Sequence, residues 1–161
     1  MRRILKSKII RILVIAGVAI ALCAFFFGRT RPAKIGEIQS FSFSYNAGST
    51  IYSYANYRLE WKEGAYTATV KHCDEPEEAA RVFSVDESFV RELEQFLIDN
   101  DVGKWNGFDK ASRTVMDGDG FSLYITMMDE TSLDARGYMK WPKNYGTVSS
   151  GIETLFGNLM E

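Results

Sequence analysis

Apolar and polar residues alternate with a period of two along several short stretches of the chain. The clearest is residues 40–45, where Phe41, Phe43 and Tyr45 alternate with serines. This alternation is typical of a strand with one buried face. Comparable stretches bounded by turn residues predict five further strands, over residues 51–62, 65–71, 81–85, 120–128 and 132–138.

Turn residues separate these predicted strands. Residues 46–49 (NAGS) read as a turn after the first strand, and Glu63-Gly64 reads as the tip of a hairpin. Asp129-Glu130-Thr131 forms the turn between the last two strands. The short connections predict that most neighbouring strands run antiparallel.

Helical spacing replaces alternation in two places. Five apolar residues from Phe89 to Leu97 recur on one helix face. Two residues qualify as the N-cap of this helix. Ser84 has the spacing of a capping box with Glu87, and Asp86 could equally be the cap. We expect Trp105 to close over the helix end.

A second amphipathic helix is predicted at the C-terminus, with its apolar stripe between residues 148 and 159. Residues 108–117 have no regular pattern and are expected to be irregular. The predicted fold is therefore α+β, with a mainly antiparallel sheet of about six strands packed with two helices. One N-terminal transmembrane helix is expected to precede it.

The expected transmembrane helix covers residues 12–28, of which residues 12–27 carry no charged or strongly polar side chain. This length is near the lower limit for crossing a bilayer, about 17 residues. Five basic residues precede the run and three follow it, so the positive-inside rule places the N-terminus in the cytoplasm. We divide the chain into a cytoplasmic segment (1–11), a signal anchor (12–28), a linker (29–36) and an extracytoplasmic domain (37–161).

Two processed forms of the N-terminus are alternatives to an uncleaved anchor. A signal peptidase site would require the small residues Ala19 and Ala21, but these lie inside the apolar run. A lipoprotein signal would use Cys23, which follows Leu22 where a small residue is needed. We therefore prefer the uncleaved anchor.

Charge is distributed unevenly, although the formal net charge of the whole chain is only −2. The first 34 residues contain no acidic residue and eight basic ones: Arg2, Arg3, Lys6, Lys8, Arg11, Arg29, Arg31 and Lys34. The remainder has 11 basic and 21 acidic residues and so carries about −10. This charge argues against nucleic acid as a partner of the domain, because binding to phosphates needs a basic surface.

No metal or cofactor site is expected. His72, Cys73, Asp74 and Glu75 are consecutive, and adjacent residues of an extended chain point to opposite faces. Asp117-Gly118-Asp119-Gly120 resembles the start of a calcium loop, but an apolar stretch follows it, so a tight turn is preferred. Cys73 is the only cysteine of the predicted outer domain, and we expect a buried, unreactive thiol.

Catalytic motifs are also missing from the sequence. A triad would have to use His72, the only histidine, as its base, and the chain has no Gly-x-Ser-x-Gly or phosphate-binding loop. A small envelope hydrolase, with a site built around His72 or two carboxylates, is the alternative to a non-catalytic protein. A third interpretation is a structural accessory subunit that pairs in the membrane through Gly17 and Ala21.

An aromatic and basic segment provides the candidate binding surface: Tyr138, Lys140, Trp141, Lys143 and Tyr145. Tyrosine and tryptophan give a large contact area at low entropic cost, which suits recognition of carbohydrate, peptide or protein. The favoured interpretation is a non-catalytic binding module at the cell envelope, with a protein or cell-wall ligand. It requires the three rings to be exposed together.

Four features of the chain occur in combination: the short N-terminal anchor, Tyr57-Arg58-Leu59, the Trp105 region and residues 117–145 (DGDGFSLYITMMDETSLDARGYMKWPKNY). In this combination the chain resembles small uncharacterised envelope proteins of anaerobic Gram-positive bacteria. It implies no activity and no catalytic residues. In such proteins Asp-Gly-Thr is expected at the last hairpin, where this chain has Asp129-Glu130-Thr131.

Overall fold

The chain divides into two units, Met1–Arg31 and Pro32–Glu161. The computed structural model describes residues 31–46, 55–72, 75–115 and 117–161. Among these residues, no helix is long and apolar enough to cross a membrane. The predicted anchor, residues 12–28, lies outside the described residues, as do residues 47–54 and Cys73.

Seven strands form one sheet in the order β4-β3-β2-β1-β6-β7-β5. Every neighbouring pair is antiparallel except β5 and β7, which are parallel. The strands are β1 (Ile38–Asn46), β2 (Ala55–Lys62), β3 (Ala65–His72), β4 (Arg81–Val85), β5 (Phe108–Ala111), β6 (Gly120–Met127) and β7 (Ser132–Tyr138).

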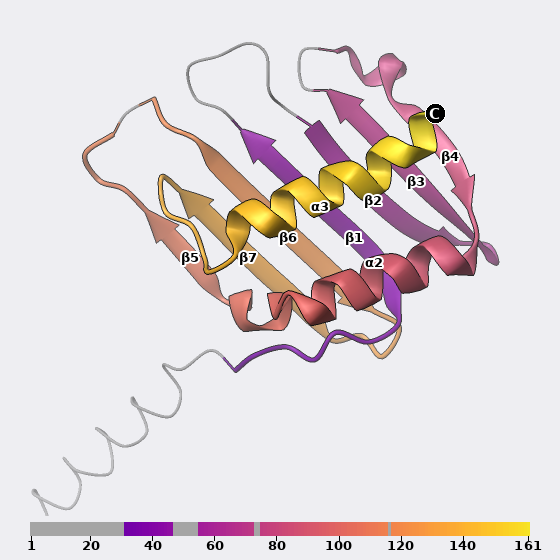
Figure 1. Ribbon diagram of the computed structural model, residues 1–161, viewed down its shortest axis with the longest axis horizontal. Coiled ribbons are helices and arrows are strands. Elements are labelled where there is room, and N and C mark those ends of the chain that lie inside the picture. Colours follow the sequence, from indigo (N-terminus) through magenta and orange to yellow (C-terminus); the bar gives the residue numbers. More distant parts are fainter. Residues whose placement is uncertain (1–30, 47–54, 73–74, 116) are drawn as a thin grey trace, which may run out of the picture. The chain divides into compact units, whose positions relative to one another are not determined.

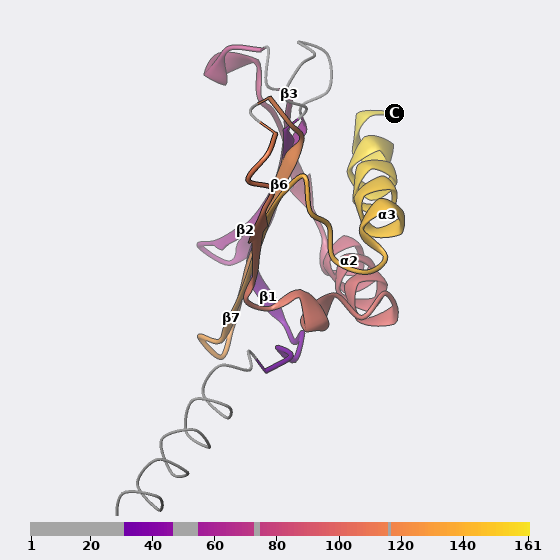
Figure 2. The same cartoon turned by 90° about the vertical axis from the view of Figure 1, so that its left-hand side faces the viewer.

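Two helices, α2 (Glu87–Asp99) and α3 (Tyr145–Gly157), lie side by side on the same face of the sheet (Figures 1 and 2). Three short 3-10 helices complete the described elements: η1 (Glu77–Ala79), η2 (Val102–Trp105) and η3 (Asn158–Met160). The predicted α+β class with a mainly antiparallel sheet and two helices is confirmed.

The number of strands differs from the prediction, because β5 forms in the segment expected to be irregular. It has four residues, Phe-Asp-Lys-Ala, and three of them are exposed. No alternation marks so short an exposed strand. β5 is held in the sheet by its backbone pairing with β7, which runs from Phe108 opposite Ala135 to Ala111 opposite Tyr138. The sequence of β5 alone does not indicate this pairing.

Strand register assigns the two faces of the sheet. Phe41 lies between Leu59 of β2 and Ile125 of β6, and all three side chains are buried beneath the helices. The next residue, Ser42, lies between Arg58 and Tyr124, which are exposed on the open face. The alternation in the sequence therefore corresponds to one covered and one open face.

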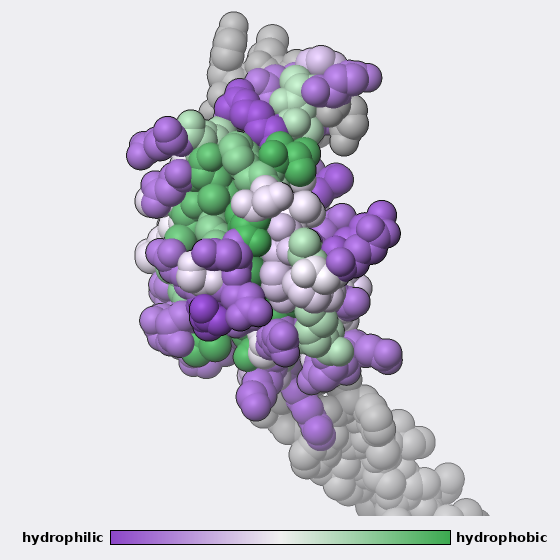
Figure 3. Space-filling model, turned by 90° about the vertical axis from the view of Figure 1, so that its right-hand side faces the viewer, coloured by the Kyte–Doolittle hydropathy of each residue, from purple (hydrophilic) through white to green (hydrophobic). Residues whose placement is uncertain are grey.

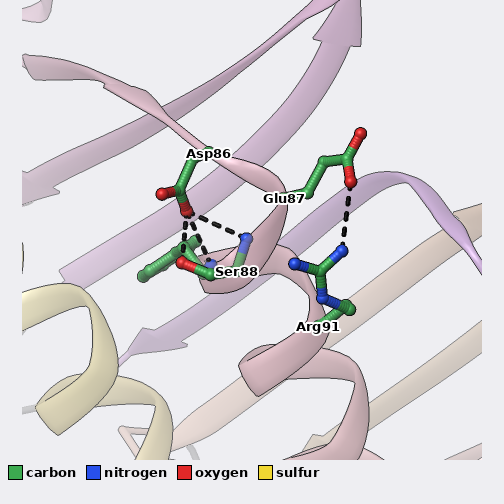
Figure 4. Close-up of polar contacts among 5 residues, drawn as sticks. Asp86, Glu87, Ser88 and Arg91 are labelled. Atoms are coloured by element: carbon green, nitrogen blue, oxygen red, sulfur yellow. Dashed lines mark hydrogen bonds and ion pairs between the residues drawn. The ribbon is translucent and has the colours of Figure 1, made fainter.

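Asp86 begins α2, which resolves the choice between the two predicted caps. Its Oδ1 accepts hydrogen bonds from the backbone N–H groups of Ser88 (2.9 Å) and Phe89 (3.1 Å) (Figure 4). Ser84 lies in β4 instead. The bonds from the Ser88 side chain and from the Phe89 and Ser88 backbone hold the pKa of the Asp86 carboxyl below its usual value.

The two predicted apolar stripes pack onto the sheet and against each other. The core residues of the helices are Val90, Leu93, Leu97, Val148, Ile152, Leu155 and Phe156. Gly151 of α3 faces Phe96 of α2, and a Cβ at this glycine would lie 2.1 Å from the Phe96 ring. The missing side chain therefore lets the helices approach closely at this point.

Part of the predicted linker, residues 29–36, packs against the domain. Ile35 is buried at 7% exposure, and the N–H of Ala33 donates to the carbonyl of Gly103 (2.9 Å). A Cβ at Gly103 would lie 2.1 Å from the Ala33 carbonyl oxygen, so this contact requires glycine.

Two hairpin turns follow the prediction in position. Glu63 and Gly64 both have positive φ (54° and 86°), as in the type I′ turn that suits a two-residue hairpin. At the second turn, Glu130 adopts a left-handed conformation (φ 65°), and Asp129 accepts a hydrogen bond from the Thr131 N–H (3.0 Å). Glutamate thus occupies the position where the resembling proteins are expected to have glycine.

Strand β4 forms one edge of the sheet, and apolar side chains gather there beside charged ones (Figure 3). Val82 is 64% exposed and Met160 is 41% exposed. The Arg81 guanidinium donates to Met160 Sδ (3.0 Å), which ties the end of the chain to this edge.

Candidate functional site

The segment that follows β7 turns back over the end of the sheet before it enters α3. Met139 and Asn144 have φ values of 52° and 63°, so both ends of the turn use left-handed residues. The Met139 N–H donates to the Asp119 carbonyl (2.8 Å), and the Gly118 N–H donates to the Tyr138 hydroxyl (2.7 Å). These bonds hold the aromatic segment in one conformation.

Phe121 is the ring on which this segment rests. Its centroid lies 5.8 Å from that of Trp141, 4.8 Å from that of Tyr145 and 5.9 Å from that of Trp105. Gly137, opposite Phe121 on β7, leaves room for the ring, since a Cβ there would lie 2.4 Å from Phe121 and 2.1 Å from the Lys140 carbonyl oxygen. The aromatic cluster therefore depends on a glycine in the neighbouring strand.

Trp105 connects the aromatic segment to η2. Its ring stacks on Tyr145 (6.1 Å between centroids), and its Nε1–H donates to the Lys143 carbonyl (3.0 Å). Trp105 is 3% exposed and lies in η2, which follows α2. This hydrogen bond places the backbone of Lys143 beside η2.

A groove of about 320 Å³ lies between the aromatic segment, η2 and β5. We call it the lysine–aromatic groove. Its lining residues are Asn100, Asp101, Lys104, Trp105, Phe108, Lys110, Trp141, Pro142, Lys143 and Asn144. Three rings and three lysines thus meet on one concave surface.

The five residues of the predicted binding surface differ in their exposure and in whether they line the groove. Trp141 and Lys143 line the groove, and Trp141 is 38% exposed. Tyr145 is half-buried behind Trp141, and Lys140 is exposed but does not line the groove. Tyr138 is half-buried, and its hydroxyl accepts from Gly118. The structure thus brings Trp141 and Tyr145 together as one stacked pair. The expectation that all three rings are exposed together is wrong, because only Trp141 is exposed.

Of the lining residues only Trp141 and Lys143 belong to the predicted surface, and three of the others add a ring and two lysines. Lys104 comes from η2, and Phe108 and Lys110 come from β5. Phe108 and Lys110 are about 30 residues from Trp141 in the chain, and the parallel pairing of β5 with β7 brings both into the groove that Trp141 lines. No local pattern signals this, because β5 itself could not be predicted.

Among the described residues, an ion pair neutralises only one of the three lysines in the groove. Lys104 Nζ lies 2.7 Å from Asp101 Oδ2, and Lys110 Nζ lies 5.2 Å from the centroid of the Phe108 ring. Within the described ranges, no carboxylate lies at ion-pair distance from Lys110 or Lys143. The groove therefore carries a surplus of positive charge in an acidic domain.

The Tyr145 hydroxyl is buried without a hydrogen-bond partner in the described structure. Ser149 lies near it and favours the ionised form, but no hydrogen bond of good geometry joins the two hydroxyls. Burial is the larger effect and raises the pKa of Tyr145 well above its usual value. The phenol is therefore neutral and acts as a packing surface for Trp141.

His72, the only base available for a hydrolase triad, lies at the end of β3, away from the groove. Its backbone N–H donates to the Glu75 carboxylate (3.2 Å). Elsewhere in the described chain, no three His, Cys, Asp or Glu side chains come together as metal ligands. Asp119 takes part in the turn before β6 through its backbone, since its carbonyl accepts from Met139.

Comparison with known proteins gives no family for this chain. No protein-family model matches it. No curated protein matches it with significance either. The resemblance to envelope proteins therefore stays a prediction, and the function is argued from the groove itself.

Proposed function

We propose that this protein is a non-catalytic binding module of the cell envelope, held in the cell membrane by a signal anchor at residues 12–28. The apolar run and its basic flanks support the anchor, with the N-terminus in the cytoplasm and the domain outside. The negative charge of the domain supports a partner other than nucleic acid.

The lysine–aromatic groove is the proposed binding surface. The observation that carries the proposal is the meeting of Trp105, Phe108 and Trp141 with three lysines in one groove. Trp141 is the exposed ring of the three and lies on a held segment, so it provides contact area without a large loss of conformational entropy on binding. Two hydrogen bonds and two left-handed residues hold that segment before any ligand arrives.

Binding to envelope material tests this proposal. The full-length protein in detergent is sedimented with cell walls, and separately with membrane vesicles, of the cells that make it. We expect the wild type to sediment with one of them and Trp141→Ala to stay in the supernatant. Tyr124→Ala is the matched control, because Tyr124 is a 48%-exposed ring on the open face of the sheet.

Equal sedimentation of all three proteins would show that the groove is not the binding surface. Topology is tested separately by a reporter fused after Glu161. A reporter that is active outside the cytoplasm supports the proposed orientation, and one that is active only inside overturns it.

A further inference from the structure

The charge of the lysine–aromatic groove differs from that of the rest of the domain. Residues 35–161 contain 11 basic and 21 acidic residues, and three of those basic residues line this one groove against a single aspartate. We infer that the groove binds an acidic sugar, a pyranose ring that carries a carboxylate or a phosphate. This inference rests on the proposed function, since it names the ligand class of the same groove.

The rings provide the surface for the sugar. Tyr145 stacks on Trp141 at 4.5 Å with 28° between the ring planes, and Phe121 also contacts the indole. Trp141 remains 38% exposed and lines the groove together with Phe108. An indole held in this way packs against the C–H face of a pyranose without reorganising.

Lys110 and Lys143 provide the charge. Lys104 is already paired with Asp101, whereas the ammonium of Lys110 contacts only the face of Phe108 among the interactions described for the domain. Lys110 of β5 and Lys143 of the aromatic segment line the same groove, and we assign the acidic group of the sugar to these two lysines. Ammonium groups bind carboxylate and phosphate as point charges with charge-assisted hydrogen bonds.

The N-terminal end of α3 adds to this positive potential. Asn144, which lines the groove, precedes α3, and its side chain makes no capping hydrogen bond. Asn100, which ends α2 and also lines the groove, donates from its backbone and its side chain to the Phe96 carbonyl (3.2 and 2.9 Å). These bonds satisfy one carbonyl at the negative end of α2, whereas no side chain caps the positive end of α3.

The size of the groove and the amide of Asn144 favour a sugar. A volume of about 320 Å³ is at the small end of ligand pockets, which begin at roughly 300 Å³, and suits one or two rings rather than a folded peptide segment. Asn144 also lines it, and its side-chain amide, which makes no capping hydrogen bond, is of a type that pairs with hydroxyl groups.

Fluorescence titration of the full-length protein in detergent tests the inference, because Trp105 and Trp141 both line the groove. The probes are a hyaluronan tetrasaccharide for the carboxylate, glucose 1-phosphate for the phosphate, chitotetraose as the neutral sugar and AMP as a nucleotide. We expect at least one of the two acidic sugars, the tetrasaccharide or glucose 1-phosphate, to bind about tenfold more tightly than chitotetraose at low salt. High salt should remove this difference in affinity.

Lysine variants give the decisive comparison. Lys110→Gln and Lys143→Gln should each weaken binding of the acidic sugar about three- to fivefold and leave binding of chitotetraose unchanged. Lys140→Gln is the matched control, because Lys140 is an exposed lysine of the same segment outside the groove. Thermal melting by circular dichroism verifies that each variant folds.

Four outcomes overturn the inference: equal binding of acidic and neutral sugars, no effect of the two lysine variants, tighter binding of AMP, and no binding of any sugar. The first two, with loss of binding in Trp141→Ala, leave the proposed function intact. Failure of the proposed function itself would be seen in the sedimentation test, in which Trp141→Ala would then sediment like the wild type.

Discussion

The indole of Trp141 stacks on the phenol ring of Tyr145, with 4.5 Å between the centroids and 28° between the ring planes. Three residues separate the two in the chain, and the second of them, Lys143, accepts a hydrogen bond from Trp105. The stacked pair rests on Phe121 of β6. The exposed ring of the proposed binding surface is therefore an extension of the core, and its position depends on buried residues.

Phe121→Ala should destabilise the domain by roughly 3–5 kcal/mol, because it removes a ring that is 5% exposed and leaves a cavity under the aromatic segment. Tyr124→Ala, three positions along the same strand on the open face, should change stability by less than about 0.5 kcal/mol. Urea unfolding of the full chain, followed by circular dichroism, measures both. Similar midpoints for the two variants would show that Phe121 does not support the cluster.

Two glycines of α3 should respond to alanine in opposite directions. At Gly151 the new Cβ would lie 2.1 Å from the Phe96 ring, so Gly151→Ala should cost about 1–3 kcal/mol. At Gly157 nothing lies within 4 Å and φ is −62°, so Gly157→Ala should stabilise the protein by up to about 1 kcal/mol. Thermal unfolding of both variants tests the prediction. A stabilising Gly151→Ala would mean that the helices are not held as closely as the structure shows.

Asp86 should make stability depend on pH in the acid range. Its pKa in the folded state is below its usual value of 3.8, so the ionised cap stabilises the fold above the pKa of the unfolded state. That contribution is lost as the pH falls through the lower folded-state pKa. Asp86→Asn keeps a capping oxygen but does not titrate.

The wild type should therefore lose melting temperature more steeply than Asp86→Asn between about pH 5 and 2. Parallel melting curves over that range measure the difference. Coincident pH profiles would be inconsistent with a cap that acts through its charge.

Removing the buried hydroxyl of Tyr66 or of Tyr145 should affect the stability of the domain differently. The Tyr66 hydroxyl donates to the Ile38 carbonyl (2.8 Å), so Tyr66→Phe should cost roughly 1–2 kcal/mol. The Tyr145 hydroxyl is buried without a partner among the described residues, so Tyr145→Phe should be neutral or slightly stabilising. Urea midpoints of the two variants give the comparison, and a larger loss for Tyr145→Phe would show that its hydroxyl does have a partner.

Local patterns in the sequence were enough to predict the strands with alternating residues and the two helices. Residues 40–45 alternate because one face of β1 packs under the helices, and the stripe from Phe89 to Leu97 marks the buried side of α2. The hairpin tip at Glu63-Gly64 was predictable as well, since a two-residue turn restricts the residues it accepts. These features depend on interactions between residues close in sequence or on burial of a whole face.

Only the tertiary structure decided the seventh strand and the groove. Phe108 and Lys110 reach Trp141 because β5 pairs in parallel with β7, a contact between segments about 27 residues apart that leaves no local signal. The separation of Tyr138 from the stacked pair is likewise decided by the turn at Met139 and the hydrogen bond from Gly118. The sequence by itself determined which residue types were available and where the charge lies; long-range strand pairing determined which of them meet.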